Sequence, residues 1–330
     1  MGGAAACGLL VSIINYRTGP LTLRCLEAVA AECAALAAAE DLRVEVVVVD
    51  NASGDGSAEE IADWIAAGPH PMGVRLIRSA VNAGFSGGHN RALEAVAAER
   101  YLLLNSDALL RPGALAALLE AAARHPEAGL LAPRIEHEDG TVQTSCFRFA
   151  GPASELIRGA GSGPLTRLLA RHDVPLEIPP PPDRIGWASF ACILLRGEMV
   201  RRIGLLDEGY FLYFEDAEYC LRARRAGFGV VYVPQARVVH LRGRSGPVKA
   251  LQRAHARLPA YYYASRTRFL YQAHGRLGLL AANLGWALGR AVARTRPLTG
   301  RAVPAVPQRQ WRDLWINFLT PLGDRRATGD

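Results

Sequence analysis

The stretch Val44-Glu-Val-Val-Val-Val-Asp-Asn-Ala-Ser-Gly-Asp-Gly-Ser57 combines three local signals in a fixed order. Its apolar half, residues 44–49, is typical of a strand buried on both faces of a parallel sheet. The small and polar residues that follow predict a turn. Ser57, with Glu60 three residues later, predicts the capping box of a helix that runs to about Ala67. A strand, a turn and a helix in this order indicate an α/β unit.

The same alternation continues on both sides of this unit. Further strands are predicted at residues 9–14, 74–77, 101–104, 129–132, 187–195 and 228–233, and helices at 21–39, 88–98, 113–124, 198–203 and 215–226. Strands that alternate with helices at this spacing predict an α/β fold with a mostly parallel central sheet and helices on both faces. Such sheets bind ligands beyond the carboxyl ends of their strands.

Residues 151–184 interrupt this pattern, because they are dense in Gly and Pro and include four consecutive prolines at 179–182. The composition predicts a long flexible loop or lid, or alternatively a stiff polyproline linker. We expect an α/β domain over residues 1–245 that contains this loop, followed by a basic helical C-terminal region over residues 246–330.

Charge is unevenly distributed along the chain. Residues 242–330 hold 16 Arg or Lys against 3 Asp or Glu, whereas residues 1–241 hold 22 against 28. A basic region of this kind favours an anionic partner such as membrane phospholipid, a lipid diphosphate or nucleic acid. No nucleic-acid-binding motif accompanies it, so no nucleic acid partner is expected. The apolar run at 277–289 is too short to span a bilayer and fits a buried amphipathic helix better than an interfacial one.

The cysteines and the N-terminus indicate the compartment. Six cysteines are scattered without Cys-x-x-Cys spacing, which is typical of free thiols in a reducing environment. No basic segment precedes the first apolar stretch, so a signal peptide is not expected. We therefore expect a cytoplasmic protein, in peripheral contact with the inner face of the cytoplasmic membrane through its basic region.

The stretch Tyr210-Phe-Leu-Tyr-Phe-Glu-Asp-Ala-Glu218 places three carboxylates within four residues, after a run of aromatic side chains. Adjacent acids behind bulky aromatics are costly to desolvate unless their charge is used. Glu215 and Asp216 are the candidates for such a use. Glu218 is expected on the helix surface, paired with Arg222 one turn later.

Two candidate ligand-binding stretches follow predicted strands. Asp50 at a strand tip would accept hydrogen bonds from a nucleobase imide or a ribose hydroxyl. An Asx turn by Asp50 or Asn51 is the alternative, but such a turn alone would not require an acid at the strand tip, so ligand contact is favoured. The Gly-rich stretch Asn82-Ala-Gly-Phe-Ser-Gly-Gly-His-Asn90 would leave backbone amides free before a helix, which suits a phosphate or diphosphate.

Two candidate metal ligands come later in the chain. Asn105 and Asp107 flank a small residue, and alternate residues of an extended segment point the same way, so both would face one hard cation. A helix N-cap from Ser106 or Asp107, before Pro112, is the alternative explanation. His240 ends an apolar strand, where it is either a structural hydrogen-bonding group or a metal ligand.

These motifs occur together in one order: Asp50-Asn-Ala-Ser-x-Asp-Gly-Ser, Asn82-Ala-Gly-Phe-x-x-Gly-x-Asn, Leu-Leu-Asn-Ser-Asp107, Tyr-Phe-Glu-Asp216 and Val-Val-His240. Over about residues 9–245 the sequence resembles the family 2 glycosyltransferases, in particular their bacterial rhamnosyltransferase-like branch. The resemblance implies the GT-A fold, a nucleoside-diphosphate-sugar donor, a Mg²⁺ or Mn²⁺ ion, and inversion at the anomeric carbon.

The resemblance also assigns roles. Asp50 matches the family's nucleobase-contacting acid and Asp216 its catalytic base, with Glu215 as the fallback. Asp107 matches the second acid of the metal motif and His240 a metal or diphosphate ligand. Asn105 stands where the family has the first acid, so its oxygen would coordinate without charge. The expected donor-binding residues are Asn15, Asp50, Asn51, Asn82, Gly84, Asn90 and Asn105.

The expected reaction is a single displacement in which an acceptor hydroxyl attacks while the nucleoside diphosphate leaves. A dTDP- or UDP-sugar, with rhamnose as the sugar, is the expected donor, and a glycan or lipid-linked hydroxyl is the expected acceptor. Two other classes compete: a non-catalytic nucleotide-sugar-binding protein, which the Asn105 departure favours, and a nucleic-acid-binding protein acting through its basic tail. The sequence gives no indication of oligomeric state.

Overall fold

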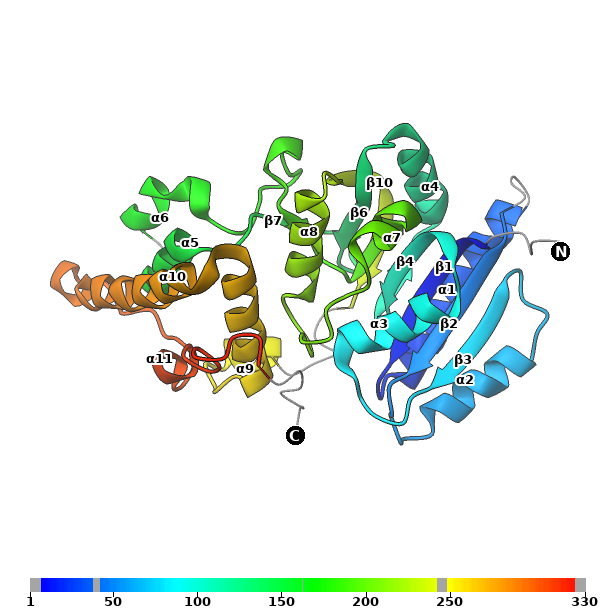
Figure 1. Ribbon diagram of the computed structural model, residues 1–330, viewed down its shortest axis with the longest axis horizontal. Helices are drawn as coiled ribbons and strands as arrows, with labels where there is room; N and C mark the ends of the chain where they lie inside the picture. The colour runs from blue at the N-terminus through cyan, green and yellow to red at the C-terminus, as the bar shows by residue number, and fades with distance from the viewer. Residues whose placement is uncertain (1–6, 38–41, 162, 242–247, 324–330) are drawn as a thin grey trace.

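The computed structural model describes residues 7–37, 42–161, 163–241 and 248–323 (Figure 1). Within these residues an eight-stranded sheet has the order β3-β2-β1-β4-β9-β6-β10-β5. Its strands are β1 (Cys7–Asn15), β2 (Val44–Asp50), β3 (Gly73–Arg78), β4 (Ala98–Asn105), β5 (Ala108–Leu110), β6 (Ala128–Glu136), β9 (Cys192–Arg196) and β10 (Gly229–His240). β9 runs antiparallel to β4 and β6, and β5 antiparallel to β10, while the other pairs are parallel. The predicted mostly parallel sheet is confirmed.

Helices cover both faces of the sheet, as predicted. One face carries α1 (Gly19–Ala37), α2 (Ser57–Ala66) and α4 (Ala114–Arg124), and the other carries α3 (Gly84–Ala95), α7 (Gly197–Ile203) and α8 (Glu215–Arg225). Within β1, Leu9 and Val11 pack into the first core and Leu10 into the second. Burial on both faces is the reason that the strands read as continuous apolar runs.

Two local predictions were wrong. The capping box at Ser57 is absent: Gly56 is the N-cap of α2, and the Ser57 hydroxyl bonds Asn15 and Asp55 instead. The strand predicted at 187–195 is broken into β8 (Trp187–Ala188), which pairs with β7 (Cys146–Phe147), and β9. The break at residues 189–191 borders the cavity described below.

The Gly/Pro-rich segment is partly helical rather than one long loop. It contains α5 (Pro152–Ala160) and α6 (Pro164–Leu168), each with proline in its first turn, where a missing N–H costs nothing. α5 packs on α10 (Ala260–Arg294), and a Cβ at Gly159 would lie 2.2 Å from the Trp286 carbonyl oxygen. The glycines that resemble loop residues in the sequence thus permit a close helix–helix contact.

The C-terminal region is helical, with α9 (Val248–Arg253), α10 and α11 (Gln310–Asp313). α10 is bent at Gly275, whose φ of 70° is accessible to glycine without strain. The expected boundary at residues 245–246 and the end of the helix predicted at 21–39 lie outside the described residues. Among the helices that are described, none is both long and apolar enough to cross a membrane.

Candidate active site

A cavity of about 130 Å³ lies where β4 and β10 end. Four of the predicted site residues line it: Asn105, Glu215, Asp216 and His240. The structure therefore brings together residues that are up to 135 positions apart in the sequence, as expected for the carboxyl edge of a parallel sheet.

The two acids stand on the first turn of α8, behind a strained stretch of backbone. Tyr213 and Phe214 both have positive φ, 72° and 69°, which costs non-glycine residues of order 1–3 kcal/mol each. Phe214 packs on Phe269 and Tyr262, which holds this conformation in place. This backbone conformation precedes the N-terminus of α8, where the side chains of Glu215 and Asp216 line the cavity.

Burial dominates the electrostatics of this acid pair. It raises the pKa of Asp216 to about 7, against hydrogen bonds from the backbone of Ala217 and Phe190 that favour the charged form. Burial and the neighbouring Asp216 charge raise the pKa of Glu215 well above its usual range. Glu215 Oε2 is buried without a hydrogen-bond partner. A carboxylate whose pKa lies near neutral pH is suited to act as a general base.

Asp107 and His240 form a second buried pair beside the acids. Residues 106–107 form a turn rather than an extended segment, so Asn105 and Asp107 do not face one point through strand alternation as predicted. Instead, the antiparallel pairing of β5 with β10 brings His240 Nε2 to 3.3 Å from Asp107 Oδ1. Both Asp107 oxygens are buried without a hydrogen-bond partner.

This donor set fits a hard divalent cation. Asp107 is fully buried with the His240 imidazole as a close neighbour, and neither of its oxygens accepts a hydrogen bond of good geometry, so a cation would complete this site. Within the described residues no group of three or more His, Cys, Asp or Glu side chains is placed to hold a metal. Any further ligands would be neutral oxygens, such as that of Asn105 at the cavity wall, or would come from the substrate.

Asn15 and Asp50 lie side by side at the tips of β1 and β2. Asn15 Nδ2 donates to Asp50 Oδ1 at 2.8 Å, to Ser57 Oγ at 2.7 Å and to Ser53 Oγ at 3.1 Å. The Ser53 N–H donates to the other Asp50 oxygen at 3.2 Å. We call these four residues the asparagine network. Unlike both oxygens of Asp107 and Oε2 of Glu215, the polar side-chain atoms of this network have hydrogen-bond partners within the protein.

The Gly-rich stretch is not a turn with free amides. α3 begins at Gly84, four residues earlier than predicted, and the Phe85 N–H donates to the Phe211 carbonyl at 2.8 Å. A Cβ at Gly84 would lie 2.1 Å from that carbonyl oxygen. Asn51 Nδ2 donates to Asn82 Oδ1 and to the Gly84 carbonyl. The glycine thus serves close packing against the segment that precedes Glu215.

Asn90 joins α3 to the same segment. Its side chain donates to the Leu206 carbonyl at 2.9 Å and accepts from the Leu206 N–H at 3.0 Å. It also donates to Glu208 Oε1 at 3.1 Å. The structure therefore places Asn90, a predicted donor-binding residue, where it positions the segment that leads into α8.

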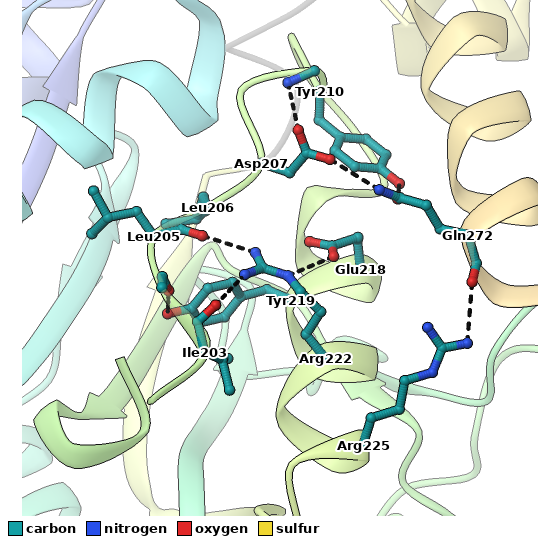
Figure 2. Close-up of polar contacts among 12 residues, drawn as sticks. Ile203, Leu205, Leu206, Asp207, Tyr210, Glu218, Tyr219, Arg222, Arg225 and Gln272 are labelled. Carbon is teal, nitrogen blue, oxygen red and sulfur yellow. Dashed lines mark hydrogen bonds and ion pairs between the residues drawn. The ribbon is translucent and has the colours of Figure 1, made fainter. Parts of the chain in front are cut away.

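Figure 2 shows how α8 and α10 hold this segment from the other side. Asp207 accepts a hydrogen bond from Gln272, which the figure shows. It also accepts two from Arg268. Glu218 is buried rather than on the helix surface, and Arg222, as predicted, donates to it at 2.6 Å. Arg222 also donates to the carbonyls of Ile203 and Leu205. The C-terminal region thus helps to position the acid pair.

Several cavity residues were not singled out from the sequence. They are Phe85, Ser189, Phe190, Ala191, Leu212 and Lys249. The apolar pattern predicts residues 189–191 as part of a strand, and nothing in it indicates that they border the cavity. Lys249 had one available signal, since it is the single lysine of the chain.

The match to a protein-family model decides the family. The model described as "Glycosyltransferase like family 2" matches residues 7–258. The chain belongs to glycosyltransferase family 2. Over 303 residues this family 2 enzyme is 30% identical to the N-acetylglucosaminyl-diphospho-decaprenol L-rhamnosyltransferase of Mycobacterium tuberculosis, with 86% of this chain and 90% of that protein covered. A shorter match of 56 residues, 36% identical, relates it to the rhamnosyltransferase WbbL of Escherichia coli, covering 17% and 21% of the two chains.

Solved structures agree on the fold of this glycosyltransferase. The mannosyltransferase PcManGT from Pyrobaculum calidifontis, in complex with GDP-Man and Mn²⁺, matches with a TM-score of 0.56 at 15% identity over 96% of this chain and 86% of that one. TarS (1–349) from S. aureus in complex with UDP matches with a TM-score of 0.54 at 14% identity over 96% and 80%. The predicted GT-A fold and rhamnosyltransferase-like glycosyltransferase class are confirmed, and the non-catalytic alternative is set aside.

Proposed function

We propose that this protein transfers rhamnose from a dTDP- or UDP-linked donor to a hydroxyl of a lipid-linked glycan, with inversion at the anomeric carbon. The similarity to the mycobacterial rhamnosyltransferase, whose name gives a sugar-diphospho-polyprenol acceptor, supports the acceptor class. The observation that carries the reaction type is the acid pair: Asp216, with a pKa of about 7, opens onto the cavity that His240 also lines.

Asp216 acts as the general base in this proposal. It accepts the proton of the acceptor hydroxyl while that oxygen forms a bond to the anomeric carbon. The bond from the anomeric carbon to the diphosphate oxygen breaks on the opposite face, and the electron pair leaves with the nucleoside diphosphate. Burial and the neighbouring Asp216 charge raise the pKa of Glu215 well above its usual range, which favours its neutral form beside the base.

Asp107 and His240 would hold the divalent cation, Mg²⁺ or Mn²⁺, with the Asn105 oxygen as a neutral contributor. When bound, the cation supplies positive charge to the departing diphosphate. Asp50 is proposed to bind the nucleobase imide, oriented by Asn15. Asn51, Asn82, Gly84 and Asn90 are proposed to shape the donor side rather than to touch the reacting atoms, and their hydrogen bonds within the protein support this role.

We further propose that residues 1–245 form the catalytic domain and that residues 246–330 contact the acceptor or the membrane. Catalysis would then take place at the cytoplasmic face of the membrane that holds the lipid-linked acceptor. The basic composition of the C-terminal region supports this location.

The test is a transfer assay with dTDP-rhamnose, UDP-sugars and a GlcNAc-diphospho-prenol acceptor, each with Mg²⁺ or Mn²⁺. We expect a rhamnosylated lipid whose new linkage, read by NMR, has the anomeric configuration opposite to that of the donor. Retention of configuration would overturn the mechanism. A product from another donor but none from dTDP-rhamnose would overturn the sugar assignment and leave the mechanism standing.

A further inference from the structure

The second half of α10, after the bend at Gly275, buries one side and exposes the other. Gly285 and Gly289 on its buried side lie against the backbone of α5. In Figure 1 this half of the helix extends to the left edge of the molecule, away from the central sheet. Its exposed positions between residues 277 and 292 are Leu277, Ala281, Leu284, Ala287, Leu288, Ala291 and Val292.

Every one of these exposed positions is apolar. Leu277, Leu284 and Leu288 are 81%, 54% and 58% exposed, and they recur at helical spacing along one face. A surface helix usually turns charged and polar side chains to solvent, so a contiguous apolar face marks an interaction surface. Arg276 and Arg294 stand at the two ends of this face, where long basic side chains can reach phosphates.

A second exposed apolar stripe adjoins the first. Trp311, Trp315, Leu319 and Leu322 are all exposed in the segment that follows α10. Arg276 Nη1 donates to the Leu319 carbonyl at 3.3 Å, so this stripe meets the first one near Leu277. We call the two stripes together the apolar face. Exposed tryptophan beside arginine is typical of side chains that sit at the headgroup level of a bilayer.

The surrounding charge selects the partner. Between residues 276 and 313 the chain has seven arginines and one acid, Asp313, which Arg257 already holds with two hydrogen bonds. A second copy of the chain would bring the same positive charge to this face, whereas an anionic bilayer brings the opposite charge. The helices described are not suited to cross a membrane, but an amphipathic helix can lie in its surface.

We propose that the apolar face inserts into the headgroup region of an anionic lipid bilayer, with the second half of α10 lying in the membrane plane. This inference is independent of which sugar and acceptor the enzyme uses. Leucines and tryptophans enter the boundary of the acyl chains, and the arginines at the ends of the helix bind lipid phosphates.

Vesicle flotation of the full chain tests the proposal, with vesicles of phosphatidylglycerol and phosphatidylcholine compared with vesicles of phosphatidylcholine alone. We expect the wild type to bind the anionic vesicles. In Leu284→Glu/Leu288→Glu this binding should weaken roughly tenfold or more, because the two leucines that enter the bilayer are lost. Leu284→Ser/Leu288→Ser should weaken binding without adding charge. Ala116→Glu/Ala123→Glu, which adds the same charge at exposed positions of α4, should bind like the wild type.

Three results would overturn the proposal: no binding by the wild type, unchanged binding by both leucine variants, or a wild-type dimer that Leu284→Ser/Leu288→Ser converts to monomer. The last would assign the face to a second copy of the chain.

A fluorophore attached at a single engineered cysteine tests the proposal independently. Such labelling is site-specific because all six native cysteines are buried. A polarity-sensitive label at Leu288→Cys should shift to the blue with anionic vesicles and be quenched by spin-labelled lipid. The same label at Ala116→Cys should do neither. An unshifted label at position 288 on vesicle-bound protein would place the contact elsewhere and contradict the proposal.

Discussion

The asparagine network and the acid centre lie at the same edge of the sheet, yet they are built in opposite ways. By the acid centre we mean Asp107, Glu215, Asp216 and His240. In the network, Asn15 donates to three neighbours, and both Asp50 oxygens accept hydrogen bonds. In the acid centre, both oxygens of Asp107 and one of Glu215 are buried without a hydrogen-bond partner.

We infer from this difference that the asparagine network stabilises the fold, whereas the acid centre takes part in ligand binding and the reaction. Buried polar groups in proteins are normally hydrogen-bonded, so a bonded network stabilises the fold and fixes the loop geometry. Buried acids without partners destabilise the free protein and are retained where a ligand or a reaction uses them. Substitutions in the two regions should therefore have opposite effects on stability and on activity.

The largest expected effect is on turnover by Asp216→Asn. Removal of a general base typically lowers the rate by about 10²–10⁴-fold, and the isosteric amide keeps the shape of the site. Steady-state transfer with saturating donor measures it. Undiminished turnover would exclude Asp216 as the base, and a comparable loss only in Glu215→Gln would move that role to Glu215.

Asp107→Asn should abolish the stabilisation that a divalent cation and nucleotide together provide. A ligand at a concentration 100 times its Kd stabilises the folded state by about 2.7 kcal/mol, and this stabilisation should disappear when the carboxylate is removed. Thermal unfolding with nucleoside diphosphate and Mn²⁺ measures it. Asp139→Asn, at an exposed acid in the turn after β6, is the control and should respond like the wild type.

The pH dependence of turnover should reflect the deprotonation of Asp216 in the acid pair. Because Asp216 must be deprotonated to accept a proton and its pKa is about 7, the rate should rise with pH and level off above that value. Below pH 7 we expect the transfer rate to fall about tenfold for each pH unit. A profile that stays flat from pH 5 to pH 8 would show that no base with this pKa limits the reaction.

Asn15→Ala should act mainly on stability. It leaves Asp50, Ser53 and Ser57 without their shared donor, which costs about 1–3 kcal/mol for a buried unsatisfied group. Chemical denaturation measures the loss. An unchanged free energy of unfolding would mean that water replaces the amide and that the network is not a scaffold.

The sequence predicted the sheet and most of its helices because its signals there are local. Continuous apolar runs mark strands buried on both sides, and they predict the ends of β1, β2 and β3 to within two residues. The apolar run at 187–195 predicts one continuous strand, and this prediction was wrong because the signal is only local. Nothing in the run shows that residues 189–191 leave the sheet to border the cavity.

The site could be predicted only as a set of residues, not as an arrangement. The motifs named Asp107, Asp216 and His240, but the contact between Asp107 and His240 depends on β5 pairing with β10, which is long-range information. Likewise, Gly84 has the composition of a phosphate-binding turn, and only the packing against Phe211 shows that its missing side chain serves a close backbone contact.

The most direct test of the contrast is to measure turnover and thermal stability together at pH 8 for Asp216→Asn and Asn15→Ala. The folded state raises the pKa of Asp216 from 3.8 to about 7, so its charge lowers stability as pH rises through that window. At pH 8 we predict that Asp216→Asn is nearly inactive yet melts at least about 2 °C above the wild type, the shift that 1 kcal/mol produces in a domain of this size. Asn15→Ala should melt lower and keep most of its turnover per folded molecule at saturating donor, with the cost to donor binding appearing in KM because Asn15 orients Asp50. An active Asp216→Asn that melts below the wild type would contradict the account.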